Sequence, residues 1–187
     1  MIKSGKLLKE QFPNMLHVTC LAHGLHRICE FVRDNFSDVN KLISLVKKIF
    51  LKAPSRVSIY KGKYPHLPLL PAPVITRWGT WIEANSFYFN NLEQVKTVIS
   101  SLSDNARSII DCKMLLAEPS LSNNIRSIQE HSGTLPSTIT FFEIENIPLK
   151  EGLSKLNNVL NNLKVTPGEI GPRLWNKIDT IKKKIQI

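Results

Sequence analysis

The sequence predicts a mainly α protein in which a short α/β segment precedes a series of helices. Apolar residues recur at helical spacing over most of the 187 residues. One apolar run with a β-branched centre, residues 15–20, indicates a strand near the start. Prolines concentrate in residues 54–76 and separate the front of the chain from the back. The length and the 42% hydrophobic content suffice for a globular domain with its own core.

The front segment, residues 1–53, holds the predicted strand and three predicted helices. Amphipathic periodicity places these helices over residues 4–12, 21–36 and 37–53. Ser37 is the expected N-cap of the third helix, whose apolar stripe comprises Val39, Leu42, Ile43, Val46, Ile49 and Phe50. A lone strand leaves backbone donors and acceptors unpaired. We therefore expect it to pair with residues 57–60 or to belong to a sheet outside this chain.

Residues 54–76 form a predicted connector. Each proline removes a backbone donor and disfavours helix at the residue before it. The segment also shows no helical period. We expect an extended, ordered connector.

The back of the chain, residues 77–187, is predicted to be a series of helices with no internal repeat. Thr76 and Ser103 are the expected N-caps of its first two helices. The residues expected to face inward in the second are Ile109, Ile110, Cys112, Leu115 and Leu116. Leucines and a valine recur at helical spacing over residues 149–163.

The net charge of +10 lies almost wholly in residues 1–77, where 13 Lys+Arg face 4 Asp+Glu, a net +9. The remaining residues carry 12 against 11, a net +1. A localised positive field favours a polyanionic partner such as nucleic acid, or is a solvated basic face. No apolar run approaches the roughly 18 residues of a membrane span. Three cysteines, an odd and small number, argue against a disulfide framework and for a reducing compartment.

Six basic residues form a predicted phosphate-contact strip across the end of the third helix and the start of the connector. They are Lys47, Lys48, Lys52, Arg56, Lys61 and Lys63. The alternative is a solvated helix end, where lysines complement the helix dipole.

The segment "HVTCLAHGLH" places His17, Cys20, His23 and His26 three residues apart. A zinc site needs four such ligands in a tetrahedron, and no second Cys/His pair follows at useful spacing. A Cys–His nucleophilic pair lacks an orienting third group. The favoured interpretation is structural: Cys20 is a small buried residue and His23 hydrogen-bonds at a strand-to-helix junction. The carboxylates are expected to be solvated surface groups.

The stretch "TRWGTW" opens a helix after the connector. A helix N-terminus favours anions, and Arg77 adds a donor fork suited to phosphate. Trp78 and Trp81 lie three residues apart, on neighbouring parts of one face. An exposed tryptophan beside an arginine suits stacking on a displaced base. The alternative makes both tryptophans core anchors, an interpretation that fits Trp81 better than Trp78.

In this order, "FPNMLHVTCLAHGLHRICEFVR", "VNKLISLVKKIFLKAPSR" and "TRWGTW" resemble the middle of an hAT-superfamily transposase. Cys20 and His23 match the Cys-x2-His motif that opens a helix of the family's RNase H-like core. Arg77 and Trp78 match the Arg-Trp motif of its all-α insertion domain. The resemblance covers most of residues 1–115.

The resemblance implies an incomplete RNase H-like α/β core segment in residues 1–53, followed by an all-helical insertion domain in residues 77–187. Intact relatives would be DDE-type DNA transposases that use a divalent metal such as Mg²⁺. The tryptophan matching Trp78 would help hold a flipped base at the transposon end. The family's first two catalytic aspartates precede the Cys-x2-His motif, and we expect the chain to begin past them. Its last catalytic glutamate has no assignable counterpart, so no catalytic residue or cofactor is expected here.

We therefore expect a truncated, catalytically inactive hAT transposase-like protein that is nuclear, or cytoplasmic if not imported. Expected partners are DNA, and further copies of the chain or related transposases, with no membrane association. The expected nucleic-acid-binding residues are Arg77, Trp78, Lys47, Lys48, Lys52, Arg56, Lys61 and Lys63. Two alternatives stay open. The chain is a segment of an active transposase, or it is a helical protein-interaction module that uses the face of residues 148–165.

Overall fold

The computed structural model describes residues 7–8, 10–14, 20–74, 77–103 and 105–185. Its longer helices are α2 (Leu21–Asn35), α3 (Ser37–Phe50), α4 (Pro54–Lys63), α5 (Gly79–Ser101), α6 (Arg107–Leu116), α7 (Pro119–Ser132), α8 (Leu135–Phe142), α9 (Leu149–Lys164) and α10 (Ile170–Ile185). These ranges contain no strand, so the mainly α prediction is confirmed for them. Residues 15–19 of the predicted strand lie outside the described residues. Cys20, the last residue of that run, has extended backbone just before α2.

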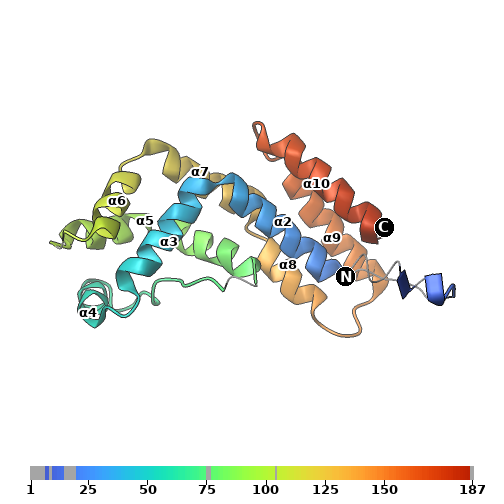
Figure 1. Cartoon of the computed structure of the whole chain (residues 1–187), viewed down its shortest axis with the longest axis horizontal. Coiled ribbons are helices and arrows are strands. Elements are labelled where there is room, and N and C mark those ends of the chain that lie inside the picture. The colour runs from blue at the N-terminus through green and yellow to red at the C-terminus, as the bar shows by residue number, and fades with distance from the viewer. Residues whose placement is uncertain (1–6, 9, 15–19, 75–76, 104, 186–187) are drawn as a thin grey trace.

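Helices α5 and α7 pack against each other in the middle of the molecule (Figure 1). Helix α2 packs on α5, α8 and α10, and the α9–α10 hairpin lies along one side of it. At the other end of the molecule, α3 packs against α4 and α6. The buried apolar side chains of all these helices form one continuous core. None of the described helices is both long enough and apolar enough to cross a bilayer.

The expectation of an extended connector over residues 54–76 is wrong for its first part, which forms α4. Pro54 occupies the first turn, where a missing N–H donor costs nothing because the first N–H groups of a helix have no partner. The remaining prolines follow the helix. Tyr60 is buried against Phe50 of α3, with ring centroids 6.2 Å apart in an edge-on arrangement. The pairing of residues 57–60 with a strand is therefore wrong as well, because these residues are helical.

The remainder of the connector, residues 64–74, is free of helix and lies over α4. Tyr60 donates a hydrogen bond to the carbonyl oxygen of Pro68 over 2.6 Å. The Lys61 ammonium donates to the carbonyl oxygen of Leu67. These two bonds tie residues 67 and 68 of the connector to α4.

The predicted N-caps are not used. Ser37 is the first residue of α3, and the buried Phe36 stands at the cap position. Ala106, rather than Ser103, precedes α6. Trp78 precedes α5, and Thr76 lies outside the described residues. No side-chain capping hydrogen bond is made at the N-termini of α2 to α9. Packing of apolar faces therefore decides where these helices begin.

The predicted apolar stripes are buried or half-buried, with three exceptions. The stripe of α3 is buried throughout. In α6, Ile110 is exposed although Ile109 and Cys112 beside it are fully buried. In α9, Leu149 and Leu153 are 78% and 39% exposed, whereas the residues further along the helix are buried against its neighbours.

Two buried tyrosines differ at their hydroxyl groups, and this predicts opposite effects of the same substitution. The Tyr60 hydroxyl donates to Pro68, whereas the Tyr88 hydroxyl is buried without a partner among the described residues. We expect Tyr60→Phe to lower the free energy of unfolding by about 1 kcal/mol, because a hydrogen bond is lost. Tyr88→Phe should raise it by about 1 kcal/mol, because an unpaired buried hydroxyl is removed. Urea denaturation measures both, and a destabilised Tyr88→Phe would mean that a buried water satisfies this hydroxyl.

Candidate nucleic-acid interface

Two tryptophans stand at the start of α5, and one of them holds this helix against α3. Trp81 is buried, and its indole N–H donates to Oδ1 of Asn40 over 3.1 Å. Trp81 is therefore a core residue. Trp78, one turn earlier, is only half-buried. The Thr80 hydroxyl accepts the Val74 N–H over 2.9 Å and so ties the end of the connector to the first turn of α5.

The Arg33 guanidinium lies over the Trp78 ring, 4.0 Å from its centroid. Its Nη2 and Nε atoms also donate to Oδ1 of Asp34, over 2.7 and 3.1 Å. Arg33 comes from the last turn of α2 and was not among the predicted site residues. No sequence spacing links it to Trp78, because the two meet only through the packing of α2 beside α5.

A cleft of about 340 Å³ opens between α3, the end of the connector and the start of α5. Arg33, Lys47 and Trp78 line it, together with the polar side chains of Asn40 and Ser44. Its volume falls within the range of small-ligand pockets, about 300–1,000 Å³. The cleft thus combines two cationic groups, polar groups and an aromatic face.

A second, smaller cleft of about 160 Å³ lies on the other side of Lys47. The ring of Tyr60 and residues 69–72 of the connector form much of its wall, which is mainly apolar. Lys47 therefore stands between the two clefts, and its half-buried side chain borders both.

The predicted basic strip divides into two groups. Lys48, Lys52 and Lys63 are exposed, and within the described ranges no hydrogen bond or ion pair holds their ammonium groups. Arg56 and Lys61 instead serve the fold. Nη1 of Arg56 donates to the carbonyl oxygen of Ile49 over 2.8 Å, at the end of α3, and Lys61 binds the connector.

Arg77 is exposed and does not line the cleft. It lies near His26 instead and contributes to lowering the pKa of that imidazole. The side chains of Arg77 and Trp78 in the Arg-Trp motif therefore have different neighbours, His26 for the first and the cleft for the second. Arg33 occupies the position beside Trp78 that was expected for Arg77.

The Cys-x2-His motif differs from its predicted environment. Cys20 is exposed, so the expectation that it is buried is wrong. His23 is exposed too and makes no hydrogen bond with the described part of the chain. The core-facing positions of α2 are Ala22, Gly24, Leu25, Ile28, Cys29 and Val32. Positions 20 and 23 lie off that face, which explains both differences.

Among the described histidines of this segment, His26 is the one that contacts another element. Its Nε2 lies 4.0 Å from Oε1 of Glu143, just after α8, and its Nδ1 is buried without a partner among the described residues. Burial lowers the pKa of His26 below its ordinary value of 6.5, and nearby His23 and Arg77 lower it further. Glu143 opposes this by raising it.

The described His, Cys, Asp and Glu residues form no group of three that could hold a metal ion, and His17 lies outside them. All three cysteines are free thiols. Burial raises the pKa of both Cys29 and Cys112 to about 12, so these two thiols stay protonated at neutral pH. No protein-family model matches the chain, and neither a curated protein nor a solved structure matches it.

His26 predicts that acidification destabilises the fold. Its folded pKa lies below 6.5, so the unfolded chain takes up the proton first and stability falls as the pH drops below about 6.5. We expect the difference in unfolding free energy between neutral pH and about pH 5 to be smaller in His26→Gln than in the wild type. Substituting the exposed His66 by Gln is the matched control and should leave the difference unchanged. Urea denaturation at the two pH values measures it, and equal differences in wild type and His26→Gln would contradict the assignment.

Proposed function

We propose that the chain is an hAT transposase-like protein that binds nucleic acid and has no strand-cleaving activity of its own. The observation that carries this proposal is the cleft between α3 and α5, where Trp78, Arg33 and Lys47 meet. The resemblance of the Cys-x2-His and Arg-Trp motifs to those of hAT transposases is the basis for proposing this family. Divalent-metal catalysis is assigned to transposases of the resembled family, with which the chain would pair in the nucleus.

The exposed charges of the basic strip, and Lys47 in the cleft, suit a phosphate backbone. Lys48, Lys52 and Lys63 are exposed near the end of α3 and along α4, without ionic partners in the described part of the chain. Lys47 carries the positive charge into the cleft itself. Phosphate contacts of this kind give affinity and orientation, without sequence specificity.

Trp78 suits an unpaired base. Its indole is half-buried at the cleft, and Arg33 covers part of it with a planar cation. A base that leaves its stack gains a flat surface there, and Nη1 of the guanidinium, which does not donate to Asp34, can contact the adjoining phosphate. Only single strands or distorted duplexes offer such a base, so the proposal favours these over regular duplex DNA.

The protein-interaction alternative is less favoured, because most of its proposed surface is buried. Leu156, Val159, Leu160 and Leu163 of α9 pack inside the molecule. Only the first turns of α9 leave leucines exposed, at Leu149 and Leu153.

Replacing the exposed lysines should weaken nucleic-acid binding and reduce its salt dependence. The variants are Lys48→Ala, Lys52→Ala and Lys63→Ala. We expect the slope of log K against log salt to fall by about 1 for each phosphate contact that is removed. Lys150→Ala removes an exposed lysine of α9 and is the matched control. Fluorescence anisotropy over a salt series measures the slopes, and equal slopes in all four variants would contradict the proposal.

Trp78 should distinguish unpaired from paired bases. Stacking of one base on an aromatic ring contributes about 1–3 kcal/mol, so Trp78→Ala should weaken binding of a single-stranded oligonucleotide roughly tenfold or more. Trp78→Phe keeps a ring and should lose less. Binding of a fully paired duplex should change little in either variant. Equal losses for single strand and duplex would argue against a base at Trp78.

A further inference from the structure

A second group of cations surrounds a tryptophan on the α9–α10 hairpin. Nζ of Lys164 lies 5.4 Å from the ring centroid of Trp175, and Nζ of Lys182 lies 5.5 Å from it. We call these three residues the Trp175 cluster. Trp175 is half-buried, so part of its ring is accessible. The hairpin lies at the end of the molecule away from α3 and α4 (Figure 1).

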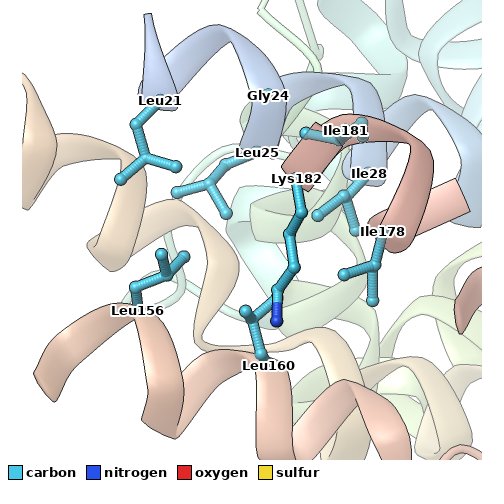
Figure 2. A pocket seen from close by; sticks show the side chains of 9 residues that line it. All are labelled: Leu21, Gly24, Leu25, Ile28, Leu156, Leu160, Ile178, Ile181 and Lys182. Atoms are coloured by element: carbon cyan, nitrogen blue, oxygen red, sulfur yellow. The ribbon is translucent and has the colours of Figure 1, made fainter. Parts of the chain in front are cut away.

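Packing holds Lys182 in place. Figure 2 shows its side chain extending from α10 toward α9 across a small pocket between α2, α9 and α10. Apart from Lys182, the residues around this pocket are apolar, and at about 20 Å³ it is too small for a ligand. The methylene groups of Lys182 cover it, which leaves the ammonium group at the surface beside Trp175.

The two ammonium groups of the cluster share one ring, and among the described residues no carboxylate pairs with either. The acidic residue of α10, Asp179, binds Lys183 over 2.7 Å. Helix α10 carries five basic residues against this one acid, a local excess that the net +1 of the back half of the sequence conceals. Two cations beside one ring, without a counter-charge among the described residues and within a local excess of positive charge, favour an anionic ligand at this surface.

We propose that the Trp175 cluster is a second nucleic-acid contact surface, in which the lysines bind a phosphodiester group and the indole packs against a base or sugar. The proposal takes its ligand class from the proposed function, since the cleft at Trp78 already calls for nucleic acid. It adds that one chain holds two separate segments of nucleic acid. A lone phosphate or an acidic lipid would meet the lysines, but only a nucleotide adds a flat group for the indole.

The test counts bound oligonucleotides. Native mass spectrometry of the whole chain, with a short single-stranded oligonucleotide in excess, should show two molecules per chain for the wild type. Lys164→Gln combined with Lys182→Met should reduce the count to one, because Met keeps the cover over the apolar pocket and removes the charge. Lys150→Gln combined with Lys155→Gln removes two lysines of α9 outside the cluster, is the matched control and should leave two. The thermal unfolding midpoint of each variant verifies the fold, and Lys164→Gln alone, outside the pocket lining, repeats the test should Lys182→Met unfold.

The outcomes separate this inference from the proposed function. One oligonucleotide per chain that is lost in Trp78→Ala, and kept when both cluster lysines are replaced, overturns the second surface alone. If one oligonucleotide binds per chain, stays bound in Trp78→Ala and is lost when the cluster lysines are replaced, the result supports the cluster and overturns the proposed cleft. A count of two that the cluster variants do not change overturns the inference. Binding of the wild type to phosphatidylserine vesicles, with no oligonucleotide on the cluster, overturns it in favour of a lipid surface.

Discussion

The placement of Trp81 is the constraint on which the candidate interface depends. This buried indole packs the first turn of α5 against α3, and its hydrogen bond to Asn40 fixes how the two helices meet. Trp78 follows from that position, because it stands one turn earlier at the edge of the same contact. The end of the connector follows as well, because Thr80 binds Val74. The cleft therefore forms where core packing places the start of α5, and buried Trp81 fixes its wall on the α5 side.

The electrostatics of this surface depend on which basic side chains donate hydrogen bonds inside the fold and which do not. Arg56 satisfies a carbonyl group at the end of α3, and Lys61 satisfies one in the connector. Both keep their charge, yet their donors are engaged, so they add to the long-range field more than to direct contact. The exposed lysines retain free donors. In the proposed function, long-range attraction of a polyanion and direct contact with it are therefore assigned to different members of one basic strip.

Helical periodicity was sufficient to predict most of the fold, because the burial of apolar faces dominates it. Helices α2, α3, α6 and α9 lie where their stripes place them, and the series of helices expected in residues 77–187 is present as α5 to α10. Proline content alone predicts a connector in place of α4, because it does not distinguish a proline that breaks a helix from one, such as Pro54, in a first turn that tolerates it. The contact of Arg33 with Trp78 could not be predicted from the sequence. It arises from tertiary packing between two helices, and no sequence spacing relates the two residues. The RNase H-like core segment expected in residues 1–53 stays a prediction.

The absence of side-chain caps at the starts of α2 to α9 has a consequence for how the protein folds. Helices of about ten to twenty residues are marginal in water on their own, and uncapped ends lower their helicity further. Each segment therefore gains its helical shape only when its neighbours are present to bury its apolar side. The chain should fold as one cooperative unit with few stable helical precursors, and a peptide cut from any one of these helices should be largely coil in water.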